Sequence, residues 1–181
     1  MSCSLVGSEM CIRDRVVKAD PIFNYRNKME FTFSKNRWIL EEEPLGVESD
    51  FALGMHIPRR WDKILDIDSC DLMPSVGSKI INFVRDLSKK SLLKPYDQKT
   101  HIGFLRYLVL RFGHNTNELM VNIVTAYEDL DRLVPFVSQL TSEFSEITTV
   151  VNNINTRKAD VSFGEKEILL YGQPVLKEKL K

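Results

Sequence analysis

The segment from Phe104 to Thr125 constrains the fold of this 181-residue chain more than any other part of the sequence. Two apolar runs, Phe104–Phe112 and Leu119–Thr125, flank the sequence GHNTNE. Gly and Asn accept the backbone angles of a tight turn, so the pattern predicts a β-hairpin. We expect its two strands to lie near the centre of a sheet.

Other segments also have the sequence character of strands. From Tyr25 to Leu40, polar residues alternate with aromatic and aliphatic ones, which predicts a strand with one buried face and a turn at residues 34–37. Residues 41–50 are acidic, contain Pro and Gly, and predict a surface loop. Four shorter runs complete the strand pattern: Phe51–Ile57, Lys63–Ile67, Glu146–Asn155 and Glu167–Tyr171.

Two segments have the three- and four-residue spacing of amphipathic helices. The first lies between Pro74 and Leu93, with Ser75 as the expected N-cap. The second carries apolar residues between Leu130 and Leu140, and acidic residues that suit a helix N-terminus precede it. The order of elements predicts an α+β fold, with a mainly antiparallel sheet and about two helices packed on one face.

The chain is ordinary in size and composition for one globular domain, with 43% hydrophobic and 28% charged residues. Residues 1–15, MSCSLVGSEMCIRDR, do not have the character of a signal peptide and resemble the translation of a sequencing-adapter remnant. The alternative is a native N-terminal tail. Residues 16–181 are then one domain without internal repeats, and both of its ends read as cut.

Charge and cysteine content limit the partners and the compartment. Lys plus Arg total 25 and Asp plus Glu total 25, so any contact with nucleic acid has to be local. No apolar run approaches the roughly 18 residues that cross a bilayer, so we expect no membrane partner. Three cysteines are too few for a disulfide framework, which favours the cytoplasm.

The motifs of the common catalytic sites are absent from the sequence. Neither GxGxxG nor GxxxxGK[ST] occurs, so a complete nucleotide- or SAM-binding domain is not expected. The three histidines have no partners at metal-ligand spacing, and no serine lies in a GxSxG turn. Cys70 ends a predicted strand and could present a thiolate, but by itself a lone cysteine is better interpreted as a small buried residue.

Basic residues form three local groups, at residues 26–37, 59–63 and 157–158, with aromatic residues interleaved. Such groups can contact phosphates and stack on unpaired bases. They are equally typical of a solvated edge strand, where charge prevents association between sheets. Charge alone favours the second interpretation.

Six separated segments resemble the RNA uracil-C5 methyltransferases, and more narrowly the bacterial iron–sulfur members that act on 23S ribosomal RNA. In order they are FNYRNKMEFTFS, LGMHIPRRWDKILDIDSCDLMP, GFLRYLVLR, NELMVNIVT, ITTVVNNINTRKAD and LLYGQPVLKEKL. The resemblance extends from about Phe23 to Leu180. It implies the central α/β domain of such an enzyme, without the preceding TRAM domain or the following SAM-binding catalytic domain.

The resemblance also implies roles for individual residues. Cys70 corresponds to the last of four ligands of a 4Fe-4S cluster, whose first three ligands lie upstream of this chain. In the family a cysteine thiolate adds to carbon 6 of uracil and SAM supplies the methyl group, but those motifs lie beyond Lys181. We therefore expect no catalytic residue here, and neither SAM nor the cluster to bind this chain alone.

Arg26, Lys28, Arg106 and Arg111 lie within the resembling segments and are the candidates for contact with RNA; DNA is not expected as a partner. Arg106 or Arg111 could instead hold the sheet together through buried ion pairs. Two other functions stay open: a standalone, non-catalytic RNA-binding or ribosome-associated module, and a scaffold domain. The sequence does not indicate the oligomeric state.

Overall fold

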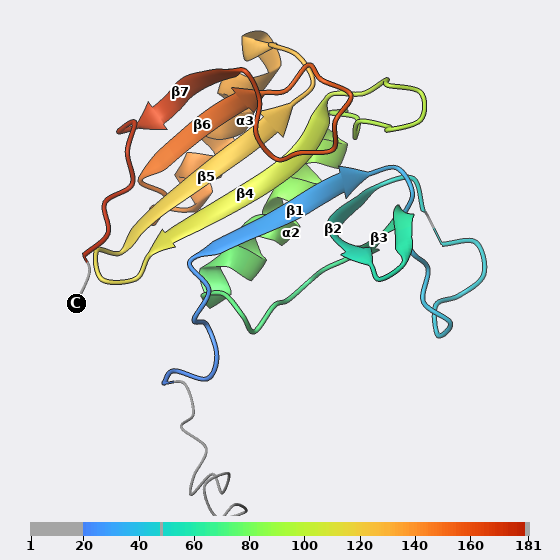
Figure 1. The fold of residues 1–181 in the computed structure, drawn as a ribbon, viewed down its shortest axis with the longest axis horizontal. Helices are drawn as coiled ribbons and strands as arrows, with labels where there is room; N and C mark the ends of the chain where they lie inside the picture. Colours follow the sequence, from blue (N-terminus) through green and yellow to red (C-terminus); the bar gives the residue numbers. More distant parts are fainter. Residues whose placement is uncertain (1–19, 48, 180–181) are drawn as a thin grey trace, which may run out of the picture.

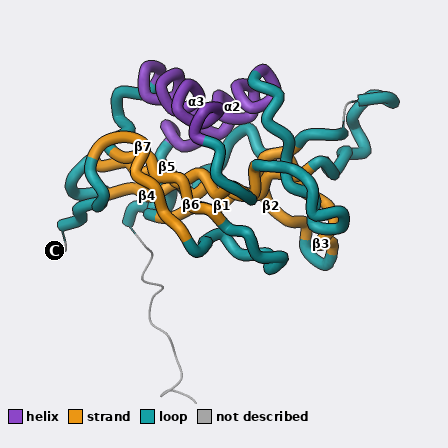
Figure 2. The backbone as a smooth tube through the Cα atoms, turned by 90° about the horizontal axis from the view of Figure 1, so that it is seen from above, coloured by secondary structure: helices purple, strands orange, loops and turns teal. Residues whose placement is uncertain are grey.

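The computed structural model describes residues 20–47 and 49–179, which form one seven-stranded sheet with two helices. The strand order is β3-β2-β1-β4-β5-β6-β7 (Figure 1). Both helices cover the same face of the sheet, and the opposite face carries only loops (Figure 2). The elements are β1 (Lys28–Ser34), β2 (Ala52–Ile57), β3 (Arg60–Asp66), α2 (Ser75–Lys90), β4 (Leu105–Gly113), β5 (Glu118–Thr125), α3 (Leu130–Glu143), β6 (Thr149–Ile154) and β7 (Lys166–Gly172).

The predicted α+β class, with a mainly antiparallel sheet and helices on one face, is confirmed. The hairpin of β4 and β5 is confirmed as well, and both strands lie inside the sheet. One pair departs from the antiparallel pattern, because β5 and β6 run parallel. The chain crosses from one to the other through α3, the kind of connection that a parallel pair requires.

Two local predictions were wrong in detail. The segment from Tyr25 to Leu40 contains only the strand β1, followed by an isolated bridge between Arg37 and Ile64. Ser75 does not cap α2, because Pro74 occupies the N-cap position and makes no side-chain hydrogen bond there. The acidic start of α3 is confirmed, since the Asp129 side chain accepts a hydrogen bond from the main-chain N–H of Arg132.

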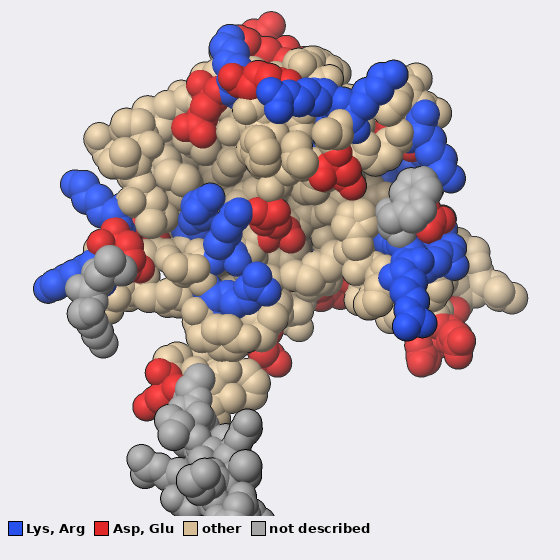
Figure 3. All heavy atoms as spheres, viewed as in Figure 1, with Lys and Arg blue, Asp and Glu red and all other residues tan. Residues whose placement is uncertain are grey.

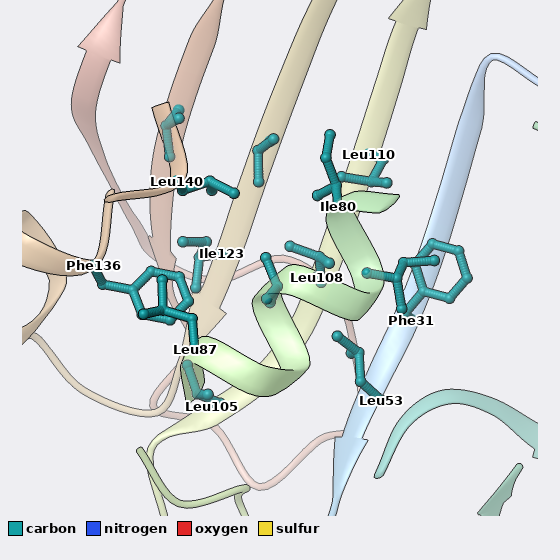
Figure 4. Packing of buried hydrophobic residues seen from close by; sticks show 14 of the residues in the cluster. Phe31, Leu53, Ile80, Leu87, Leu105, Leu108, Leu110, Ile123, Phe136 and Leu140 are labelled. Carbon is teal, nitrogen blue, oxygen red and sulfur yellow. The ribbon is translucent and has the colours of Figure 1, made fainter. Parts of the chain in front are cut away.

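The core lies between the helices and the sheet. The apolar stripe of α2 contributes Ile80 and Leu87, and α3 contributes Phe136 and Leu140, all of them buried. These side chains meet residues of β1, β4 and β5 (Figure 4). Leu108 on β4 is fully buried at the centre of this layer. Burial of one continuous apolar layer explains how two helices and seven strands form a single unit.

The interpretation of residues 1–15 as an adapter remnant lies outside the described residues. No described helix is both long and apolar enough to traverse a lipid bilayer.

Replacing Leu108 with Ala should lower the free energy of unfolding by about 2–5 kcal/mol, because it leaves a cavity in the centre of the core. Leu45 is fully exposed and provides a control with the same chemical change. Leu45→Ala should change stability by less than about 0.5 kcal/mol. Urea denaturation of both variants checks this, and equal effects would contradict the described core.

Candidate functional site

The face of the sheet without helices contains a groove that follows β1. It arises because β2 pairs with β1 only at residues 32–34 and then diverges from it. β2 continues to pair with β3 up to its end, so the β2–β3 hairpin moves away from β1 as a unit. The first half of β1 therefore has β4 as a neighbour on one side and a gap on the other.

The divergence leaves main-chain groups of β1 facing the groove. The carbonyl of Asn27 accepts a hydrogen bond from the N–H of Phe112 (2.8 Å), so odd-numbered residues of β1 exchange hydrogen bonds with β4. Even-numbered residues turn their N–H and C=O groups toward β2. In the described strand register, Thr32 pairs with Gly54 of β2, whereas Lys28 and Glu30 have no partner in β2.

Three hollows lie in succession along this strand and share lining residues. The entry hollow is about 320 Å³ and is lined by Arg26, Asn27, Lys28, Met29, Glu30 and Met55. The middle hollow is about 290 Å³ and is lined by Glu30, Thr32, Gly54, Met55, His56, Tyr107 and Asp160. The inner hollow is narrower, about 40 Å³, and shares Thr32, His56 and Asp160 with the middle one. Together they form one continuous groove.

The entry end of the groove is basic. Lys28 and Arg111 are directly opposite each other on β1 and β4, so their side chains lie on the same face. Arg26 lines the same hollow, and basic side chains gather in the lower middle part of this face (Figure 3). Lys28 forms an ion pair with Glu30. Desolvation would raise the pKa of Glu30, but hydrogen bonds from Lys28 and Ser162 and the nearby charges of Lys28 and Arg111 keep that pKa below its ordinary value.

The middle of the groove is polar and carries acidic groups. Thr32 Oγ1 lies 3.4 Å from His56 Nε2 across the last paired residues of β1 and β2. Asp160 comes from the loop after β6, and its Oδ1 accepts hydrogen bonds from the hydroxyl of Tyr107 and the amide of Gln98. No described residue donates to Asp160 Oδ2. The groove therefore changes from basic at its entry to acidic and polar in its middle, whereas the inner hollow is lined by both acidic and basic residues.

The inner end is closed by an ion pair whose carboxylate is buried. Asp97 is 6% exposed, and its Oδ2 lies 2.6 Å from Lys35 Nζ. Lys35, followed by hydrogen bonds from Thr100 and the main chain of Lys99, holds the pKa of Asp97 well below its ordinary value, although burial opposes this. The pair also lines an apolar cleft of about 690 Å³ beside the end of α2, so it forms a wall between the two cavities.

Arg106 does not face the groove as a free cation, which corrects its prediction as a contact for RNA. Its side chain is 2% exposed and donates to the carbonyls of Asn155 (2.9 Å), Arg157 (2.5 Å) and Ala159 (2.6 Å). The guanidinium also lies over the ring of Tyr96, 4.4 Å from its centre. Arg106 thus ties down the loop that carries Asp160. The alternative of a structural arginine fits better, although carbonyls take the place of the expected carboxylates.

Cys70 lies in the loop between β3 and α2, half-buried against the core. Its N–H donates to Ser78 Oγ (3.1 Å). The next two residues of that loop accept main-chain hydrogen bonds from Asn24 and Arg26, just before β1. In the described ranges, no three His, Cys, Asp or Glu side chains are placed to hold a metal ion together. A single thiol does not constitute a cluster site.

The structure thus brings Arg26, Lys28 and Arg111 to one end of the groove, places Cys70 beside the segment that leads into β1, and buries Arg106. Sequence reasoning did not select Thr32, His56, Asp97 or Asp160 as site residues, because they come from four separate segments. The available signal was position within the resembling segments, which Thr32, His56 and Asp160 share and Asp97 lacks.

Comparisons with known proteins identify relatives of one kind. No protein-family model matches the chain. An uncharacterized RNA methyltransferase of Chlorobaculum tepidum is 36% identical over 170 residues, which is 91% of this chain and 35% of that protein. A second uncharacterized RNA methyltransferase, from Porphyromonas gingivalis, is 36% identical over 165 residues, or 86% of this chain and 35% of the relative. The chain therefore spans about a third of the length of these relatives.

A solved structure is similar as well. The tRNA (uracil-54, C5)-methyltransferase of Pyrococcus abyssi, crystallised with S-adenosyl-L-homocysteine, superposes with a TM-score of 0.65 at 28% identity. The similarity covers 91% of this chain and 35% of that protein.

Replacing Arg106 with Lys should release the loop of residues 155–160, because one ammonium cannot reach three separate carbonyls. Each lost hydrogen bond from a charged group contributes about 1.5–3 kcal/mol, so trypsin cleavage after Arg157 and Lys158 should accelerate by about tenfold or more. Arg59→Lys, in the exposed turn before β3, is the control. Cleavage at an unchanged rate in the Arg106 variant would show that Arg106 does not hold the loop.

Asp97→Asn should destabilise the fold by about 2 kcal/mol at pH 7, because the buried side chain loses the charge that strengthens its hydrogen bonds from Lys35, Thr100 and Lys99. The folded-state pKa of Asp97 is depressed, so its contribution is complete above the ordinary pKa of 3.8 and is lost as the pH falls below it. The stability difference between the native protein and the variant should therefore stay constant from pH 7 to about pH 4 and shrink at lower pH. Urea titrations across this range measure it, and a difference that does not change with pH would refute the assignment.

Proposed function

Because the chain belongs to the RNA uracil-C5 methyltransferase family, we propose that it is the central RNA-binding domain of a SAM-dependent enzyme that methylates uracil in RNA. The observation that carries this proposal is the ordered match to RNA methyltransferases over about nine-tenths of the chain. Residues 16–181 are then this central domain. SAM binding and the methyl transfer belong to the parent protein, and we assign no catalytic residue to this chain.

The groove along β1 is the proposed site of RNA contact. Its basic entry, formed by Arg26, Lys28 and Arg111, suits the phosphates of a single strand. The chain as a whole has no net charge, so a local group of this kind is needed to attract a polyanion. An extended strand rises about 3.3 Å per residue, so the seven residues of β1 give a groove about 20 Å long, enough for a few nucleotides.

The finer assignment of the substrate follows the resemblance. We propose 23S ribosomal RNA in the cytoplasm as the substrate of the parent enzyme, and this rests on the segments that resemble its bacterial iron–sulfur members. The related enzyme from Pyrococcus abyssi acts on tRNA, so the substrate of this chain needs its own test.

Cys70 is the proposed single contribution of this chain to a 4Fe-4S cluster. Its half-buried position supports this, as does the main-chain pairing of the adjacent loop residues with the segment before β1. Ligands located upstream in the parent would reach the loop from that side. The described residues supply one thiol, so the chain alone does not fit a cluster, which needs four ligands.

Replacing Arg26, Lys28 and Arg111 together with Gln should weaken binding of the 181-residue chain to single-stranded RNA and flatten its salt dependence. Each phosphate contact contributes about 0.7 to the slope of log K against log salt, so three lost contacts should reduce the slope by about 2. Fluorescence anisotropy with a labelled oligonucleotide at several salt concentrations measures both quantities.

The matched control removes charge from the opposite layer. Lys79 and Lys90 are exposed on α2, on the face of the molecule away from the groove. Replacing both with Gln should leave affinity and slope close to native values. Equal effects of the two sets would refute the groove as the site, and no measurable RNA binding by the native chain would refute the proposed function.

A further inference from the structure

The middle hollow of the groove differs in chemistry from its basic entry. Its walls carry the Asp160 carboxylate, the imidazole of His56, the hydroxyl of Thr32 and the partly buried thioether of Met55. Glu30 lies on the border between the two hollows. Carboxylates repel phosphates, so an RNA strand in this groove cannot place its backbone here as favourably as at the entry.

Hydrogen bonds hold the Asp160 carboxylate through one oxygen and leave the other oxygen to accept a hydrogen bond from a ligand. Its Oδ1 takes the hydrogen bonds from Tyr107 and Gln98, while Oδ2 has no donor among the described residues. The loop that carries it is fixed by Arg106, so the carboxylate is positioned before any ligand arrives. Ionised carboxylates only accept hydrogen bonds. The ligand group that meets Oδ2 must therefore be a donor.

The floor of the hollow offers a second pair of groups. The main chain of Glu30 turns its N–H and C=O toward the side from which β2 has diverged, so a donor and an acceptor lie side by side. Met55 supplies an apolar surface next to them. A flat heterocycle with donors and acceptors along one edge matches this combination, whereas a phosphodiester, which has no donor, does not.

We propose that the middle hollow is a subsite for one unpaired nucleobase that has a ring N–H, either uracil or guanine, with Asp160 as the residue that determines specificity. The inference rests on the proposed RNA binding and adds to it a division of the groove. Phosphates lie at Arg26, Lys28 and Arg111, and a base is read at Asp160, Thr32 and His56. Adenine and cytosine present a ring acceptor at the corresponding edge position and should be bound less well.

The test is competition binding to the 181-residue chain with heptamers of uridine, adenosine, cytidine and N3-methyluridine at one salt concentration. The native chain should prefer the uridine heptamer by about tenfold over the other three, because a well-placed pair of hydrogen bonds discriminates between bases by this order. Methylation at N3 removes the donor with little change in the rest of the base. Equal affinity for uridine and N3-methyluridine heptamers would overturn the proposal.

Single substitutions identify the residues that cause the preference for uridine. Asp160→Asn keeps the shape but lacks the charged acceptor, and it should reduce the preference for uridine about tenfold while leaving the salt slope native. Thr32→Val and His56→Ala should weaken uridine binding severalfold. Asp131→Asn, on the exposed start of α3 in the opposite layer, should change nothing. Thermal melts confirm that each variant is folded.

The outcomes separate the two proposals. RNA binding that depends on Arg26, Lys28 and Arg111 but shows no base preference, or a preference that Asp160→Asn leaves intact, overturns the nucleobase subsite alone. Failure of every heptamer to bind overturns both proposals.

Discussion

The divergence of β2 from β1 is the constraint on which the groove depends. Strands in a sheet normally satisfy their main-chain groups with a neighbour on each side, but here pairing stops at Thr32 and Gly54. Gly54 allows the hairpin to pack tightly on its other side, since a Cβ atom there would lie 1.8 Å from the carbonyl oxygen of Leu65. Arg85 of α2 holds the same hairpin, with its Nε 2.8 Å from Asp66 Oδ1. Pairing between β2 and β3 and the ion pair from α2 therefore continue to hold the hairpin where its pairing with β1 has ended.

A second arginine fixes the opposite wall. Arg106 donates hydrogen bonds to three carbonyls of the loop after β6. This loop crosses the open face of the sheet (Figure 1) and places Asp160 beside Tyr107. Burial lowers the pKa of Arg106, yet its two terminal nitrogens donate to three convergent carbonyls without a carboxylate. Two buried arginines therefore shape the groove, while exposed ones supply its charge. The same residue type has a structural role where it is buried and, in the proposed RNA site, a binding role where it is exposed.

The sequence predicted the elements better than the site. Periodicity identified the helices and most strands, because each apolar stripe depends on neighbours a few residues apart. It did not reveal that α3 makes β5 and β6 parallel, or that β2 leaves β1 after Gly54, because both follow from packing between distant segments. Arg106 shows the same limit for single residues. Its charge and its place in a resembling segment suggested RNA, and only the carbonyls of residues 155–159 reveal its structural role.

The most direct test of the account is to map where RNA touches this chain. Ultraviolet cross-linking of a bound single-stranded oligonucleotide, followed by mass spectrometry, identifies the residues in contact. We expect cross-links in β1 between Lys28 and Ser34, at His56 and at Tyr107. Cross-links confined to α2 and α3, or to the apolar cleft beside the end of α2, would contradict it.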